Sequence, residues 1–177
     1  MMGARSRYTL LSTLLLMMST ARAQSFQQWI AWGDAAFSRG EFYGATRFYD
    51  GAIAIDGGRM SLQWKQAEAC RLSNQYKRAA DLYARILQKD QGRTYPTCAR
   101  WLAEMQLCTG AYKEAEETWR RVIRKEKQER SFIALRAENA LRGIAIALDS
   151  SKATGIVLEH LPKGVNSYES DFGARRG

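Results

Sequence analysis

The residues best suited to chemistry are the single histidine, His160, and the Asp171-Phe172-Gly173 triplet near the C-terminus. Such a triplet holds magnesium in protein kinases, but only behind a glycine-rich phosphate loop and a catalytic loop, and neither precedes it here. The chain also contains no P-loop and no dinucleotide-binding fingerprint. His160 has no cysteine or carboxylate cluster beside it, which favours a tail residue over a metal ligand. The sequence therefore predicts a protein that is not an enzyme, with no catalytic residue, no metal site and no cofactor.

Three cysteines, Cys70, Cys98 and Cys108, could supply redox or zinc chemistry. No Cys-x-x-Cys pair occurs, so neither a redox dithiol nor a zinc knuckle is supported. Each cysteine lies among helix-forming apolar residues, which favours small buried thiols. An odd number of cysteines cannot all pair within one exported chain, and a single bridge from Cys70 to Cys98 or Cys108 is the alternative.

Acid–base catalysis would need paired carboxylates, and the closest pattern is the trio Glu114, Glu116 and Glu117. Arg120 and Arg121 follow Glu116 and Glu117 by four residues, which is the spacing of ion pairs on one helical face. The trio is therefore interpreted as the charged start of a helix rather than as catalytic carboxylates.

The N-terminus has the three-part order of a secretory signal peptide. Two arginines precede an apolar run over residues 10–18, which is too short to span a bilayer stably. A small-x-small cleavage site then ends at Ala23, so residues 1–23 are predicted to be removed before Gln24. A retained membrane anchor is the alternative. No later segment is long and apolar enough to cross a membrane, so the mature chain is expected to be exported without a transmembrane segment.

The chain has 177 residues and a formal net charge of +9, which raises nucleic acid as a partner. Residues 1–23 carry three arginines and no acid, so their removal would leave a charge of +6. The remaining bases are spread along the chain and interleaved with acids instead of forming a stripe. We therefore expect no nucleic-acid partner, and the length fits one modest domain.

One motif occurs three times, and its first aromatic recurs at spacings of 34 and 36 residues. Its columns are Gly40, Asn74 and Gly110; Phe42, Tyr76 and Tyr112; Ala45, Ala79 and Ala115; Tyr49, Tyr83 and Trp119; and Ala52, Ile86 and Val122. The glycine or asparagine tolerates a left-handed backbone where a helix stops. The alanine lets two helices approach closely, and the last three columns form one helical stripe. Each copy is therefore predicted to be two antiparallel helices joined by a short turn.

Trp29 and Trp32-Gly33 precede the first turn, and Ala45 and Tyr49 follow it. Together they resemble the tetratricopeptide repeat, whose signature is Trp, then Leu-Gly, then Ala and an aromatic. Trp32 stands in the leucine position, and the later copies lose the leading tryptophan. The resemblance implies an all-α superhelix of about three helix-turn-helix repeats.

The repeat domain is expected to occupy residues 24–149 and to be built from seven helices. These helices are expected at residues 26–39, 42–55, 60–73, 76–89, 96–109, 112–128 and 131–148. Pro96 would lie in the first turn of its helix. The last helix would cap the open end of the stack.

Residues 150–177 are expected to form an extended tail. Residues 155–161 form a short run rich in apolar and β-branched residues, which could be a strand or a last helical turn. Residues 165–174 read Val-Asn-Ser-Tyr-Glu-Ser-Asp-Phe-Gly-Ala. The signal peptide, the repeats and this phrase resemble the start of the OmpA-like cell-envelope proteins of the type IX secretion and gliding machinery. That resemblance implies that a β-propeller begins in the tail and that a peptidoglycan-binding OmpA-like domain follows. Neither domain is present before Gly177, and a truncated relative and a fragment both stay open.

A stack of helical hairpins has a concave groove lined mainly by the first helix of each pair. The predicted lining is Asp34, Phe37, Trp64, Glu68, Arg71, Arg100, Glu104 and Leu107. Trp64 is the best single anchor because a groove-facing aromatic offers a large contact area, although it could equally belong to the core.

The expected function is a non-catalytic interaction scaffold of the cell envelope, periplasmic or associated with the outer membrane. Its partner would be an envelope or secretion-machinery protein held in the groove. The alternative is the targeting arm of a longer exported enzyme whose catalytic domain lies beyond Gly177.

Overall fold

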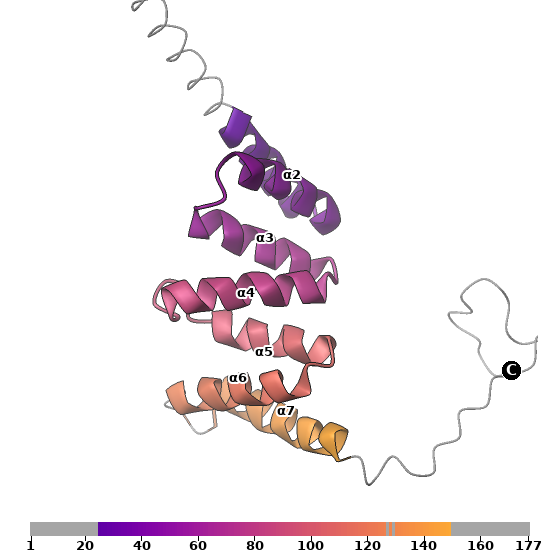
Figure 1. Cartoon of the computed structure of the whole chain (residues 1–177), viewed down its shortest axis with the longest axis vertical. Helices are drawn as coiled ribbons and strands as arrows, with labels where there is room; N and C mark the ends of the chain where they lie inside the picture. The colour runs from indigo at the N-terminus through magenta and orange to yellow at the C-terminus, as the bar shows by residue number, and fades with distance from the viewer. Residues whose placement is uncertain (1–24, 127, 129, 150–177) are drawn as a thin grey trace, which may run out of the picture.

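The computed structural model describes residues 25–126, 128 and 130–149, and this part of the chain is helical with no strand (Figure 1). A helix over residues 25–38 is followed by α2 (Phe42–Ile55), α3 (Met60–Leu72), α4 (Tyr76–Asp90), α5 (Cys98–Cys108), α6 (Tyr112–Lys125) and α7 (Phe132–Leu148). These bounds lie within three residues of the expected ones, which confirms the all-α prediction. The predicted signal peptide, its cleavage site between Ala23 and Gln24 and the predicted tail lie outside the described residues.

The helices form a single elongated stack in which each helix lies against the one before it (Figure 1). The helix over residues 25–38 pairs with α2, α3 with α4, and α5 with α6, and α7 then packs on α6. This is the arrangement of three helical hairpins followed by a further helix. It places the first helix of each hairpin on a common side of the stack.

The turns inside the three hairpins share one backbone geometry. Gly40, Asn74 and Gly110 have φ angles of 77°, 60° and 74°, which is the predicted left-handed conformation. The next residue in each turn donates its N–H to a carbonyl five residues earlier. These bonds are Glu41 to Ala36 at 3.0 Å, Gln75 to Cys70 at 2.9 Å and Ala111 to Gln106 at 2.9 Å. Each first helix therefore ends in the same hydrogen-bonded cap, which reverses the chain within a few residues.

The last three repeated columns form the core, whereas in the aromatic column of the turn Phe42 and Tyr76 are half-buried and Tyr112 is exposed. The three column alanines have no exposed surface, and Tyr49, Tyr83 and Trp119 are at most 1% exposed. A Cβ on Gly33 would lie only 2.4 Å from Cε1 of Tyr49, so the first hairpin can close only around a glycine. In the second copy, the equivalent position on α3 holds the small Ala67, which is also fully buried.

The predicted position of Pro96 in the first turn of its helix is wrong. The structure starts α5 at Cys98, with Thr97 as the preceding cap residue. Gln91 and Gly92 both have positive φ angles, 54° and 79°, so the chain makes a wider turn after α4 than the pattern indicates. This turn carries Pro96 outside the helix and brings in other side chains that support the groove.

The cysteines follow the prediction in two cases out of three. Cys70 and Cys98 are buried free thiols, and burial raises their pKa values to about 11 and about 12, which makes them poor nucleophiles. Cys108 is also a free thiol, but it is exposed because it is the last residue of α5. The alternative of a bridge from Cys70 to either of the others is not what the structure contains.

The last helix, α7, packs on α6 through small and branched side chains, including Ala134, Ala137 and Ile144. Its start is fixed by Ser131, whose Oγ accepts the N–H of Ala134 at 3.0 Å. The helix covers α6, as expected of a cap. Its own outward face, however, mixes large apolar side chains such as Phe132 with charged ones such as Arg142, and both are exposed.

Candidate partner-binding groove

A hollow of about 430 Å³ lies between the helix over residues 25–38 and α3. Four of the predicted groove residues line it together: Asp34, Phe37, Trp64 and Glu68. The remaining lining residues are Ser38, Tyr49 and Lys65. Sequence reasoning missed these three, although the position of Tyr49 in a repeated aromatic column was a usable signal. The hollow combines aromatic walls with an acid and a base at its edge.

Trp64 is the largest side chain of this hollow and is held in place by two other aromatic rings. It stacks on Tyr95, with ring centroids 4.5 Å apart and an interplanar angle of 14°. It also meets Tyr83 edge to face at 5.5 Å. Trp64 is half-buried, so it both packs on the core and faces the hollow. The geometry thus combines the two interpretations that the sequence left open, and it presents a fixed aromatic surface.

Tyr95 belongs to the turn between α4 and α5, which is anchored by one buried carboxylate. Asp90 accepts the backbone N–H of Tyr95 at 3.0 Å and that of Thr94 at 2.9 Å. These hydrogen bonds to the charged form hold the pKa of the Asp90 carboxyl below its ordinary value of 3.8. A single acid therefore fixes the turn, the turn fixes Tyr95, and Tyr95 fixes the indole of Trp64.

An acid occupies the same position in each first helix, and each of these acids binds a base. The pairs are Asp34 with Lys65, Glu68 with Arg71 and Glu104 with Arg136, each at 2.6 Å. In the first and third cases the base comes from the next helix of the same type, so the pair bridges two repeats. The groove is thus lined by a row of paired charges instead of a surface of one sign.

Two of these acids also accept a hydroxyl from the aromatic column of the second helix. Tyr49 donates to Oδ1 of Asp34 at 2.8 Å, and Tyr83 donates to Glu68. Burial, reinforced by the neighbouring carboxylate, raises the pKa of both phenols, so both stay protonated donors. Trp119 replaces the tyrosine in the third repeat, and its buried Nε1 has no hydrogen-bond partner in the described part of the chain.

The other predicted groove residues lie outside the hollow. Arg71 and Arg100 place their guanidinium groups over the ring of Trp101, at 3.9 and 4.2 Å from its centroid. Arg100 also lines a separate hollow of about 270 Å³ beside α6. Glu104 is bound to Arg136, and Leu107 is packed against the core. The structure therefore brings together four of the eight predicted residues, all from the first two repeats.

Metal and membrane chemistry can be examined only in the described part of the chain. There, no group of three or more His, Cys, Asp or Glu side chains is placed to hold a metal ion. Within the same residues, no helix has the length and apolar character needed to cross a bilayer. What the described groove offers is aromatic surface, hydrogen-bonding groups and paired charges.

Known structures share this fold, although neither a protein-family model nor a curated protein matches the sequence. The Arabidopsis OM64 TPR domain is 20% identical, with a TM-score of 0.54 over 69% of this chain and 98% of that chain. The first TPR of Spaghetti (RPAP3), bound to the HSP90 peptide SRMEEVD, is 21% identical, with a TM-score of 0.53 over 72% and 95%. The Yersinia enterocolitica type III secretion chaperone SycD, in complex with a peptide of the translocator YopD, is 18% identical, with a TM-score of 0.54 over 70% and 94%. The described part of this chain therefore has the all-α superhelical fold of tetratricopeptide repeats.

Proposed function

We propose that this chain is a non-catalytic interaction module that binds an extended segment of a partner protein in the hollow between the helix over residues 25–38 and α3. The observation that carries this proposal is the support of Trp64. An indole that is stacked on Tyr95 and held edge-on by Tyr83 loses little conformational entropy when a partner side chain packs on it. Phe37 adds a second aromatic wall, and Asp34 and Lys65 supply polar groups at the edge.

The volume and position of the hollow favour a peptide as the ligand. A space of about 430 Å³ accommodates one or two large side chains, and it opens along the side of the stack where the first helices lie. Two structural neighbours with the same fold are bound to peptides, from HSP90 and from YopD. We infer that the partner presents an apolar side chain to Trp64 and a backbone or polar group to the edge at Lys65.

Replacement of Trp64 by alanine is expected to weaken peptide binding at least tenfold, because a central buried aromatic contributes about 1.4 kcal/mol or more to an interface. The probe is a fluorescein-labelled peptide selected from a random displayed library against residues 24–177, and the readout is its dissociation constant by fluorescence anisotropy. Thermal unfolding confirms that the variant is folded.

The matched control is Trp32→Ala, because Trp32 is also a tryptophan of a first helix but does not line the hollow. It should leave the dissociation constant unchanged. A folded Trp64→Ala protein that binds the peptide as tightly as the parent chain would place the binding site elsewhere.

We further propose that the protein works outside the cytosol, in the periplasm or at the outer membrane, with an envelope or secretion-machinery protein as its partner. The support is the signal-peptide order of residues 1–23 and the resemblance of the whole chain to envelope proteins of the type IX machinery.

Residues 1–30 fused to alkaline phosphatase should give an active enzyme, because this reporter folds only after export. Leu15→Arg, which interrupts the apolar run, should abolish that activity. Activity that is equal for both fusions would contradict export by this segment.

A further inference from the structure

The outward face of α7 carries several exposed large hydrophobic side chains. Phe132, Leu135 and Ile146 lie on it and are exposed to 73%, 49% and 63%, beside the charged pair Glu138 and Arg142. These three are among the eight large hydrophobic side chains that are exposed in the described residues. The end of a repeat stack needs a polar outer face to stay in water, so a face of this composition calls for a covering element.

The contacts of α7 identify it as the first helix of a fourth hairpin. It packs on α6 in the way that α5 packs on α4. Arg136 reaches back 32 residues to Glu104, as Lys65 reaches back 31 residues to Asp34. In the second and third hairpins the first helix is covered by its own second helix, α4 or α6. The described chain ends at Asp149, before any such partner for α7.

The next residues of the chain have the composition that this face requires. Residues 156–161 are Ile-Val-Leu-Glu-His-Leu, and Val157, Leu158 and Leu161 fall on one side of a helical turn. Residues 150–155 separate this run from α7 and span at most about 20 Å. The 17 residues of α7 extend roughly 25 Å. The run can therefore reach back along most of the exposed face.

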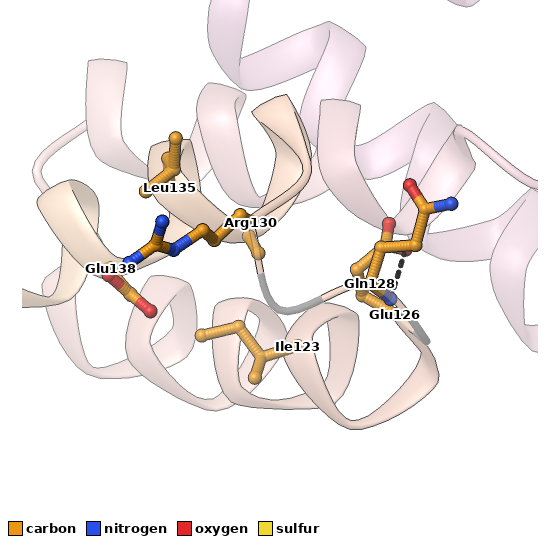
Figure 2. Close-up of a pocket in the computed structure, with 7 residues that line it drawn as sticks. Ile123, Glu126, Gln128, Arg130, Leu135 and Glu138 are labelled. Atoms are coloured by element: carbon orange, nitrogen blue, oxygen red, sulfur yellow. Dashed lines mark hydrogen bonds between the residues drawn. The ribbon is translucent and has the colours of Figure 1, made fainter.

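A hollow of about 460 Å³ lies at the far end of that face, between α6 and α7. Figure 2 shows Leu135 above and Ile123 below, with the side chain of Arg130 extending between them toward Glu138. The lining is mixed, with Ile123, Ala134 and Leu135 beside four polar or charged residues, so an amphipathic segment that lay along α7 would find both apolar and charged contacts there.

We propose that residues 155–161 fold back onto the outward face of α7, complete the fourth hairpin and cover Leu135 and Ile146. The segment is the occupant because it is apolar, directly connected and long enough to reach. The inference stands apart from the proposed peptide groove, which lies at the other end of the stack.

The test is a double-mutant cycle between the segment and α7 in the protein of residues 24–177. Leu158→Ser and Ile146→Ser should each lower the melting temperature by about 3 °C. The protein that carries both substitutions should melt about 3 °C below the parent, not about 6 °C, because the two side chains share one contact. Hydrogen exchange of the α7 amides should become faster in each single variant.

The matched control pairs Leu158→Ser with Leu72→Ser, which removes a leucine exposed on α3. These two effects should add. The proposal is overturned if Leu158→Ser changes neither the melting temperature nor the exchange of α7. It is also overturned if sedimentation shows a dimer that Ile146→Ser dissociates while Leu158→Ser does not, because a second copy is then the occupant.

Discussion

Replacement of Trp119 by alanine is expected to lower the free energy of unfolding by about 3–5 kcal/mol, the range for a fully buried large aromatic. Trp119 has no exposed surface and is the largest fully buried side chain of the described core. It lies on α6, the helix that packs against both α5 and α7, and the guanidinium of Arg136 on α7 lies 5.7 Å from its ring. Its Nε1 has no hydrogen-bond partner in the described residues, so the loss comes from packing. Urea unfolding followed by far-UV circular dichroism measures the change.

Two further variants make this expectation specific to the buried position. Trp32→Ala removes the same side chain from a site that is 44% exposed, and it should cost only about 1 kcal/mol. Trp119→Phe keeps an aromatic ring in the core. Its loss of unfolding free energy should lie between the losses of Trp119→Ala and Trp32→Ala. If Trp119→Ala costs no more than Trp32→Ala, the third hairpin does not depend on this ring.

The fold was predictable from the sequence because each hairpin is specified by residues close together in the chain. The left-handed turn at Gly40, the close approach at Ala45 and the buried ring of Tyr49 all lie within one repeat. Three copies of the same pattern then confirm one another. Helix ends were predicted to within a few residues because their caps are formed by local backbone bonds, such as the one from Glu41 to Ala36.

The groove was predictable only in part, because its details depend on contacts between repeats. The support of Trp64 comes from Tyr95, whose position is fixed by the side chain of Asp90 in a turn that contains the non-glycine left-handed residue Gln91. No periodic pattern indicates such a turn. The partner of Asp34 is Lys65, 31 residues away, and that pairing follows from how one hairpin lies on the next.

The charges illustrate the same limit of sequence reasoning. Glu68 and Arg71 were both predicted to line the partner-binding groove. The structure joins them at 2.6 Å, with side-chain exposures of 19% and 17%, and Glu68 also accepts the hydroxyl of Tyr83. A spacing of three residues allows such a pair on any helix, but only the surrounding packing decides whether it is buried.

Glu68→Ala is therefore expected to destabilise the protein by about 3 kcal/mol, because it leaves a desolvated guanidinium and a phenol without their acceptor. The Nε of Arg71 already lacks a hydrogen-bond partner among the described residues, and the hydroxyl of Tyr83 is the neighbouring polar group there that remains to interact with the guanidinium. Urea unfolding at neutral pH measures the loss. Glu68→Gln keeps an oxygen that accepts from both partners and should cost clearly less.

The double variant Glu68→Leu with Arg71→Leu decides whether the loss comes from the orphaned charge or from the missing carboxylate itself. Both leucines fill the space without a polar group, and replacing a buried ion pair in this way is often neutral or stabilising. We expect the double variant to unfold at a urea concentration well above that of Glu68→Ala but below that of the parent chain, because the phenol of Tyr83 still lacks its acceptor. Equal stabilities of Glu68→Ala and the double variant would contradict this account. They would show that the carboxylate stabilises α3 and α4 through Tyr83 alone. Removing the charge of Arg71 would then have recovered none of the free energy of unfolding that Glu68→Ala loses.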